Sequence, residues 1–545
     1  MERYRDGNRK WNNQDYDILI KKGVQNKMRT KYAIRNILTA WIGQIVVVII
    51  NFIQRRVFIH YLDISYLGIN GLFSNILSLL SLAELGIGTA IVYSLYEPLS
   101  KKDWDKAALL MKFYRRAYHA IGLFILAAGW AVTPFLSFFV KEETGISHLQ
   151  IYYMLFVLDT GISYFYSYKA ALIQADQKQY IVTVYSQAVK IIRLCVSMAV
   201  LAVWQNFFLY LCVQIASALL ENILISHKAD RMYPCLKLPL KDRTLPKEEM
   251  KKIKKNTLAM IYHKAGMILV TGTDNLLISK FVGVSAVGLY SNYVMILNAL
   301  TGILIHIFSS ITAGVGNFVV TETEERKKTL FDKVYFLTFW IYGFCSVCVF
   351  CLCNDFIEIW VGKGFHLDNS LILVMVVNYY LTGIRKPVLT FRDAFGMFWQ
   401  DRYKALVETV VNLLASILLA KYFGMFGVLL GTTISTVFVC LWVEPLILFQ
   451  HGIKGGKIGN YFLKFGIYGV ITLAAGIASY VIGQHLAAGQ MAIVRLLIKG
   501  TICAVVTGSV FWVTTFKMKE FSYVKAAVLE TLKGKESGSR KNNSV

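Results

Sequence analysis

Basic side chains interrupt several long apolar stretches of this chain, where a charge is costly unless it faces a cavity or a partner. These residues are Arg55, Arg56, Lys190, Arg193 and Lys264. Arg193 lies near the centre of its stretch and Lys190 precedes it by three residues, so both lie on one face of a helix. The pattern favours a site for an anion. The alternative is that these long side chains extend to the membrane surface.

Two acidic residues lie at a similar depth. Glu84 occurs in the stretch SLAELGIGTAI and is followed by Gly86 and Gly88, which favour a bend or the close approach of another helix. Two roles are open for Glu84, pairing with a basic cavity residue or carrying a coupling proton. Asp274 shares its stretch with Lys264 and is the best candidate to hold a cation, with a structural ion pair to another helix as the alternative.

Other polar groups predict packing or surface contacts. Four cysteines have a spacing similar to that of metal ligands: Cys345, Cys348, Cys351 and Cys353. They lie in an apolar stretch without a neighbouring histidine, so we expect apolar packing and predict no metal site. A second set is expected at the membrane interface, at the cytoplasmic end of its stretch, with contact to a substrate entering from the cytosol as the alternative: Arg385, Lys386, Arg392 and Asp393. Arg495 and Lys499 are expected to contact lipid headgroups.

The elements that position these residues follow from hydropathy. The chain has 545 residues, of which 56% are hydrophobic, more than soluble domains contain. About 20 apolar residues in a helix span the hydrocarbon core of a membrane. Fourteen such stretches occur, at 37–59, 68–96, 117–140, 150–173, 181–203, 205–227, 257–282, 284–318, 333–353, 370–391, 404–422, 425–449, 461–483 and 491–516. Because their apolarity is continuous rather than alternating, we predict an all-α polytopic membrane protein with about 14 transmembrane helices.

The distribution of positive charge predicts the orientation. With the N-terminus placed in the cytoplasm, 48 of the 58 lysines and arginines fall on the cytoplasmic side. Cytoplasmic loops retain basic residues, so this asymmetry predicts that both termini are cytoplasmic. The formal net charge of +25 therefore points to membrane topology, and we expect no nucleic-acid partner.

The sequence repeats internally. A shift of 220 residues aligns the segment that begins at Tyr66 with the segment that begins at Ala286, so helices 1 to 6 resemble helices 7 to 12. Repeats with an even number of helices run parallel in the membrane, and a site is expected where the two halves face each other. The predicted parts are a polar cytoplasmic N-terminus (1–36), an N-lobe (37–227), a basic linker (228–256), a C-lobe (257–449), helices 13 and 14 (450–516) and a basic cytoplasmic tail (517–545).

Several functions are disfavoured by what the sequence lacks. It contains no GxxxxGK[ST] loop for ATP phosphates and no HExxH zinc motif. It also has no soluble insert or long predicted outer loop of the size expected for a membrane polymerase or ligase. We therefore predict that the protein is not an enzyme and not an ATP-driven pump. A scaffold without transport would poorly explain Arg193 and Glu84 at mid-membrane.

Residues 66–103, YLGINGLFSNILSLLSLAELGIGTAIVYSLYEPLSKKD, resemble the helix 2 region of bacterial polysaccharide transporters. These are the oligosaccharide flippases of the multidrug/oligosaccharidyl-lipid/polysaccharide (MOP) exporter superfamily. The matching positions are Gly68, Gly71, Leu72, Glu84, Leu85, Gly86 and Gly88, with Arg55 and Arg56 in helix 1. The resemblance implies a V-shaped pair of six-helix lobes in the bacterial cytoplasmic membrane. It also implies alternating access that moves an undecaprenyl-pyrophosphate-linked oligosaccharide from the inner to the outer leaflet.

The resemblance and the charges together suggest one hypothesis, in which the basic residues face one cavity and hold the pyrophosphate. Guanidinium groups bind phosphate through two parallel hydrogen bonds. Alternatives are a drug/cation antiporter of the same superfamily, which would favour acidic cavity residues, and a lipid II flippase, which also has fourteen helices. No cofactor is expected beyond a coupling ion, proton or sodium. The expected partners are the lipid-linked oligosaccharide, membrane lipids, a polysaccharide polymerase and glycosyltransferases.

Overall fold

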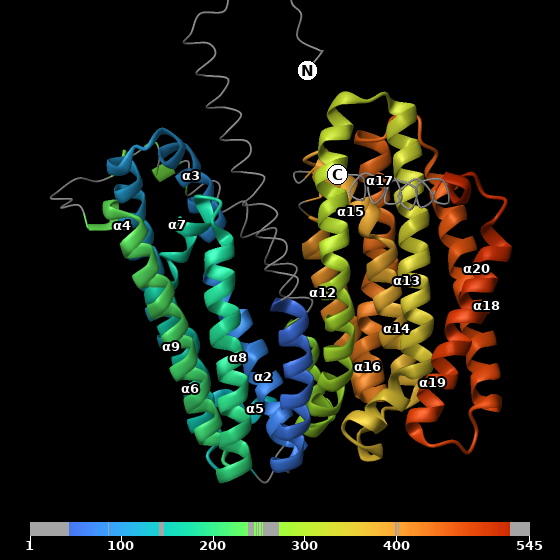
Figure 1. Cartoon of the computed structure of the whole chain (residues 1–545), viewed down its shortest axis with the longest axis horizontal. Helices are drawn as coiled ribbons and strands as arrows, with labels where there is room; N and C mark the ends of the chain where they lie inside the picture. Colours follow the sequence, from blue (N-terminus) through green and yellow to red (C-terminus); the bar gives the residue numbers. More distant parts are fainter. Residues whose placement is uncertain are drawn as a thin grey trace, which may run out of the picture. The chain divides into compact units, whose positions relative to one another are not determined.

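The computed structural model describes residues 43–84, 87–140, 146–237, 245–246, 248, 250–251, 253, 272–397, 400–401 and 403–523. All secondary structure in these ranges is helical (Figure 1). Ten helices there are long and apolar enough to cross a membrane, judged by length and composition. The prediction of an all-α polytopic membrane protein is therefore confirmed. The count of fourteen spans stays a prediction, as do the boundaries of the lobes.

The chain divides into two compact units. Unit 1 comprises Met1–Leu62, Leu80–Thr133 and His148–Ile261. Its elements are the helix Gly43–Tyr61, η1 (Ser81–Glu84), α3 (Ile87–Lys101), α4 (Trp104–Val132), α6 (Leu149–Ser167), α7 (Ala170–Ala175), α8 (Gln179–Trp204), α9 (Phe207–Met232) and η4 (Pro234–Lys237).

Unit 2 comprises Asp63–Leu79, Pro134–Ser147 and Tyr262–Val545. Its elements are α2 (Ile64–Leu80), α5 (Leu136–Phe139), α11 (Asp274–Phe281), α12 (Val284–Thr321), α13 (Glu324–Trp360), η5 (Lys363–Phe365), α14 (Asn369–Ile384), α15 (Lys386–Ala394), α16 (Lys404–Ser435), η6 (Thr436–Cys440), α17 (Leu441–His451), α18 (Ile458–Leu486), α19 (Ala492–Ile502), η7 (Cys503–Thr507) and α20 (Gly508–Thr515). The short η2 (Thr133–Phe135) lies at the boundary between the units.

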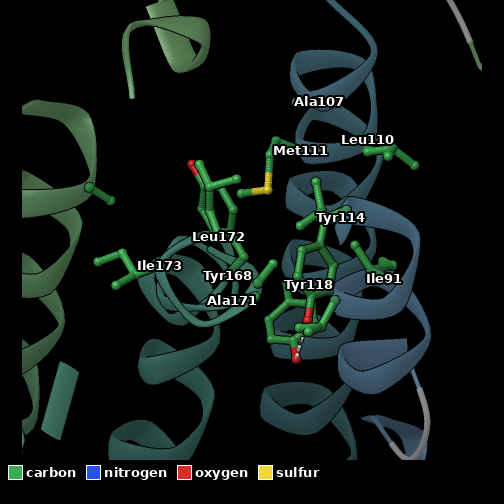
Figure 2. Packing of buried hydrophobic residues seen from close by; sticks show 14 of the residues in the cluster. Ile91, Ala107, Leu110, Met111, Tyr114, Tyr118, Tyr168, Ala171, Leu172 and Ile173 are labelled. Atoms are coloured by element: carbon green, nitrogen blue, oxygen red, sulfur yellow. Dashed lines mark hydrogen bonds between the residues drawn. The ribbon is translucent and has the colours of Figure 1, made fainter. Parts of the chain in front are cut away.

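The core of unit 1 is built from aliphatic residues and tyrosines of α3, α4 and α7. Tyr114 and Tyr118 lie one turn apart on α4, and Leu172 and Ile173 of α7 belong to the same buried cluster (Figure 2). Small residues allow the helices to approach closely, since a Cβ on Gly161 of α6 would lie 2.5 Å from the Leu126 side chain of α4. Tight packing of this kind holds the tyrosine hydroxyls in fixed positions.

In unit 2, α13 packs against α18 and α20 through aromatic rings. The rings of Phe339 and Tyr468 stack with centroids 4.3 Å apart, and Phe511 lies against Phe339 at 4.7 Å. These contacts place helices that were predicted outside the repeat, α18 to α20, in the same unit as α13. Aromatic pairs contribute about 0.5–1.5 kcal/mol beyond the area they bury.

Charged residues complete this attachment and correct one prediction. Arg495 of α19 forms ion pairs with Asp355 and Glu358 of α13, and the Lys499 ammonium lies 2.7 Å from the Asp355 carboxylate. Arg495 and Lys499 therefore pair with α13, and the prediction that they contact lipid headgroups is wrong. A paired charge at membrane depth costs much less than an isolated one, which explains the preference.

The helices of both repeats reverse direction at matching places. Gln205, between α8 and α9, has a φ of 48°, and Gly424, 219 residues later, has a φ of 54°. The chain doubles back at Gly424 and brings the residues after it against those before it. A Cβ on Gly427 would lie only 2.2 Å from the Leu419 carbonyl oxygen. α16 therefore contains two antiparallel helices, as predicted from the boundary between the stretches 404–422 and 425–449.

Candidate functional site

Two basic side chains of unit 1 are electrostatic neighbours of one tyrosine. Tyr210, near the start of α9, has Arg55 of the helix Gly43–Tyr61 and Arg193 of α8 as electrostatic neighbours. Its hydroxyl accepts a hydrogen bond from the Gln54 amide at 3.3 Å and also hydrogen-bonds with Gln214. Tyr210 is only 6% exposed. The structure therefore brings together two of the predicted anion-binding residues.

Aromatic packing fixes the position of this tyrosine. The Phe58 ring contacts the Tyr210 ring edge to face, with centroids 5.2 Å apart. Phe207 stacks on Tyr210 and meets Tyr152 of α6 at 5.0 Å. Phe58 lies one turn beyond Gln54, so the face of the helix that packs on α9 also presents Gln54 to the tyrosine hydroxyl. Local helix geometry thus sets the polar contacts.

Arg193 lies deep within its helix. Eleven residues separate it from Trp204 at the end of α8, which corresponds to about 16 Å of helix. Its Nε atom is buried and has no hydrogen-bond partner among the described residues. Asp159 of α6 is an electrostatic neighbour of Arg193, and its Oδ1 atom is likewise buried without a partner there. Unpaired buried polar atoms cost free energy, so this arrangement is suited to receiving a polar ligand.

Lys190 lies one turn from Arg193, beside Glu221 of α9. Ser186 donates a hydrogen bond of 2.5 Å to the Glu221 carboxylate. We use the name polar column for the following residues of unit 1: Gln54, Arg55, Asp159, Lys190, Arg193, Tyr210, Gln214 and Glu221. Three of these are basic and two are acidic, so the column carries an excess of one positive charge.

The remaining predicted basic residues are placed differently. Arg56 is exposed, whereas Arg55 is half-buried, because consecutive residues of a helix point about 100° apart. Lys264 lies outside the described residues. The sequence analysis missed five members of the column: Gln54, Asp159, Tyr210, Gln214 and Glu221. The two acids carried a signal, since each interrupts a predicted apolar span.

Glu84 is enclosed by tyrosines rather than by cations. Tyr118 of α4 donates a hydrogen bond to its Oε1 atom and Tyr164 of α6 donates one to its Oε2 atom, each at 2.7 Å. Tyr114 donates in turn to the Tyr118 hydroxyl at 3.2 Å (Figure 2). No basic residue pairs with Glu84 in the described part of the chain. The pairing role considered for Glu84 is thus not observed there, and a role in coupling stays a prediction.

Asp274 belongs to unit 2 and lies in the first turn of α11. Its Oδ1 atom is buried and has no hydrogen-bond partner among the described residues, and Tyr290 is its electrostatic neighbour. Within the described ranges, no group of three or more histidine, cysteine, aspartate or glutamate side chains is arranged to hold a metal ion. A cation site at Asp274 stays a prediction.

Unit 2 also contains a buried ionic cluster, which corrects the expectation of a membrane-interface patch for Arg385 and Arg392, whereas Lys386 is half-buried and Asp393 is exposed. Glu444 is 0% exposed, and its carboxylate pairs with Arg385 at 2.5 Å and with Lys404 at 2.7 Å. Arg392 is also buried and pairs with Asp401. Burial raises the pKa of the Asp401 carboxyl, although Lys404 and Arg392 oppose the shift. Arg385, between α14 and α15, and Lys404 of α16 are therefore joined to α17 through Glu444, and Arg392 joins α15 to the segment before α16.

These features define a class of protein: an all-helical, multi-pass membrane protein with charged groups inside its apolar helices. A family model described as "Polysaccharide biosynthesis protein" matches residues 33–313, slightly more than half of the chain. The chain therefore belongs to this family, which is part of the MOP superfamily. No curated protein matches the chain.

Solved structures support the fold. The inward-facing conformation of a multidrug resistance MATE family transporter of the MOP superfamily has a TM-score of 0.59 and 14% identity, covering 74% of this chain and 98% of that one. The lipid II flippase MurJ in an inward closed conformation has a TM-score of 0.57 and 15% identity, covering 88% and 100%. An outward-facing MATE transporter has a TM-score of 0.52 and 14% identity, covering 77% and 96%. The chain thus shares the fold of MOP transporters.

Proposed function

We propose that this protein is a flippase that moves an undecaprenyl-pyrophosphate-linked oligosaccharide from the inner to the outer leaflet of the bacterial cytoplasmic membrane by alternating access. One observation carries the proposal: Arg55 and Arg193, from two different helices of unit 1, are both electrostatic neighbours of the buried Tyr210 within the candidate membrane-spanning helices. A site that gathers guanidinium groups at membrane depth suits an anionic headgroup that cannot enter hydrocarbon alone.

The polar column matches the chemistry of such a substrate. Guanidinium groups bind phosphate oxygens bidentately, and the amides of Gln54 and Gln214 offer neutral hydrogen bonds to phosphate or sugar. Asp159 and Glu221 oppose the binding of an anion, which keeps the affinity moderate. A transporter needs moderate affinity, because a ligand held tightly in one state would not be released. The prenyl chain stays in the lipid, so only the headgroup requires the column.

The coupling ion is part of the proposal. Glu84 and Asp274 are the residues proposed to respond to a proton or sodium gradient, and no other cofactor is invoked. Lys264 and Arg56 complete the set of proposed headgroup ligands. The proposed partners are the lipid-linked oligosaccharide, membrane lipids, and the glycosyltransferases and polymerase that would supply and use the glycan.

A lipid II flippase is the second candidate. The MurJ structure covers 88% of this chain, whereas the two MATE structures cover 74% and 77%. This wider coverage favours a flippase over a drug/cation antiporter, and so does the basic excess of the polar column. Both flippase substrates carry a prenyl pyrophosphate, so the column serves either one, and the glycan distinguishes them.

Transport into proteoliposomes tests the proposal. The purified full-length protein would be reconstituted with a fluorescent undecaprenyl-pyrophosphate oligosaccharide or with lipid II, and leaflet transfer would be measured by quenching from outside. Arg193→Gln and Arg55→Gln should each slow transfer about tenfold to a hundredfold, because a hydrogen bond to a charged group contributes about 1.5–3 kcal/mol. Lys421→Gln, which alters an exposed residue, is the matched control. Full activity in both arginine variants would refute the proposal.

A further inference from the structure

The helices α13 and α19 of unit 2 run antiparallel and lie against each other (Figure 1). The Lys499 ammonium of α19 lies 2.7 Å from the Asp355 carboxylate of α13. In an antiparallel pair, one turn back along the first helix lies beside one turn forward along the second. Cys351 lies one turn before Asp355, and Cys503 lies one turn after Lys499. The register therefore places these two cysteines opposite each other in the next layer of the contact.

Three thiols meet at this layer. The Cys503 thiol hydrogen-bonds with the thiols of Cys348 and Cys351 on α13. Cys348 and Cys351 are three residues apart, so both lie on one face of the helix. Cys503 is 0% exposed and Cys351 is 7% exposed, whereas Cys348 is half-buried, and all three are free cysteines. Cys348 is therefore the thiol that a small reagent reaches first.

Two features of this layer favour thiol chemistry over simple packing. Lys499 is an electrostatic neighbour of both Cys351 and Cys503, and its ion pair with Asp355 fixes its position. A cation beside a thiol stabilises the negative charge that develops on sulfur during thiol exchange. A π-helical turn, Cys503–Thr507, begins at the cysteine that contacts both others. Such turns are rare and occur frequently at functional sites.

The depth of the thiols restricts the oxidant that could reach them. Nine residues separate Cys351 from Trp360 at the end of α13, which corresponds to about 14 Å of helix. The thiols pack in an apolar cluster that includes Phe339 and Phe511. A charged oxidant such as glutathione disulfide is excluded from such a region, whereas a lipid-soluble quinone enters it. Converting two thiols to a disulfide releases two protons and two electrons, which a quinone takes up when it becomes a hydroquinone.

We propose that Cys348, Cys351 and Cys503 form a redox-active thiol site whose oxidant is a lipid-soluble quinone. The Cys348 sulfur adds to a ring carbon of the quinone, and the Cys503 sulfur then attacks the Cys348 sulfur. The sulfur–carbon bond breaks as the disulfide forms, its electron pair stays on the ring, and the ring takes up the two thiol protons. Cys351 enters the disulfide by exchange at Cys503. The site goes beyond the proposed function and does not depend on it.

Oxidation of the full-length protein in lipid nanodiscs tests the site. Decylubiquinone is a suitable probe, because its ring is fully substituted and does not alkylate thiols permanently. It should remove two of the free thiols of the reduced protein and yield one hydroquinone per protein, measured by maleimide titration and by absorbance. Peptide mass spectrometry should find a disulfide between Cys503 and either Cys348 or Cys351. Glutathione disulfide at the same concentration should act at least tenfold more slowly.

Three results of this experiment would overturn the proposal. The first is an unchanged number of free thiols after treatment with the quinone. The second is a loss of thiols without a disulfide that contains Cys503. The third is oxidation by glutathione disulfide at the rate of the quinone, which would mean that the oxidant reaches the thiols from water.

Single variants separate the three thiols from their neighbours. Cys503→Ala should reduce the rate of disulfide formation to below a tenth, because Cys503 is the common partner of the other two. Cys353→Ala is the matched control and should leave the rate unchanged. Cys353 is also buried on α13, but the step of two residues from Cys351 turns its side chain by about 200°. Oxidation of Cys503→Ala at the full rate, or an equal loss in Cys353→Ala, would contradict the assignment.

A third variant keeps the test decisive if alanine at the fully buried position 503 prevents folding. Cys348→Ala alters a half-buried position and leaves Cys351 and Cys503 in place. Oxidation should slow at least tenfold, because the two remaining thiols are buried. An unchanged rate in Cys348→Ala would overturn the role of Cys348 as the attacking thiol.

Discussion

Two helices of unit 2, α2 and α12, cross where Gly68 lies against the Val284 backbone and Gly288 against the Ile64 backbone. This glycine crossing supports a quantitative prediction. Alanine at position 68 would bring its Cβ to 1.9 Å from a backbone oxygen, and alanine at position 288 to 2.5 Å. Since contacts below 3.0 Å are not tolerated, the helices must separate by at least about 1.1 Å for Gly68→Ala and about 0.5 Å for Gly288→Ala. Alanine at position 71 would meet the Val287 side chain at 3.3 Å, where a small adjustment is sufficient. The geometry therefore orders the three variants.

The magnitude follows from the cost of overpacking, about 1–3 kcal/mol for an inserted methyl group. Gly68→Ala should therefore lower the free energy of unfolding the most, Gly288→Ala less, and Gly71→Ala little or not at all. The assay is thermal unfolding of each full-length variant beside the unaltered protein.

Two results would refute this reasoning. One is a loss of stability in Gly71→Ala as large as that in Gly68→Ala, which would mean that steric overlap does not control the crossing. The other is unchanged stability in Gly68→Ala, which would mean that the backbones do not approach as closely as the structure shows.

Three further predictions concern stability. Glu444→Gln should lower the free energy of unfolding of unit 2 by about 3–5 kcal/mol, because it leaves Arg385 and Lys404 buried without their carboxylate. Thermal unfolding measures this loss. The control is Glu97→Gln, which removes an exposed ion pair with Lys101 that contributes about 0–1 kcal/mol. Asp355→Asn should loosen α19 from α13, and amide hydrogen exchange should rise in α19 but not in α4; unchanged exchange in α19 would contradict it. Gly424→Ala should lower the free energy of unfolding by about 1–3 kcal/mol, because alanine is strained at φ 54° and ψ −130°. Gly476→Ala should leave the free energy of unfolding unchanged, since its Cβ would lie 3.6 Å from the nearest side chain.

The sequence by itself determined the class of the fold. Apolarity over about 20 residues is a local property, so the membrane-spanning stretches could be predicted without knowing any partner. The repeat was equally visible, and its shift of 220 residues reappears in the crossing of α2 and α12. The break near Glu84 was expected from the glycines that follow it, and the structure has a 3₁₀ turn there.

The tertiary structure alone decided which charge meets which partner. Arg55 and Arg56 are adjacent and identical in type, yet only Arg55 lies near Tyr210, because one step along a helix turns the side chain by about 100°. Arg495 pairs with an acid 140 residues away, and Glu84 with a tyrosine 80 residues later. A hydropathy pattern records whether a residue fits hydrocarbon. It does not record which helix lies beside it, and the fate of a charge at membrane depth depends on that neighbour.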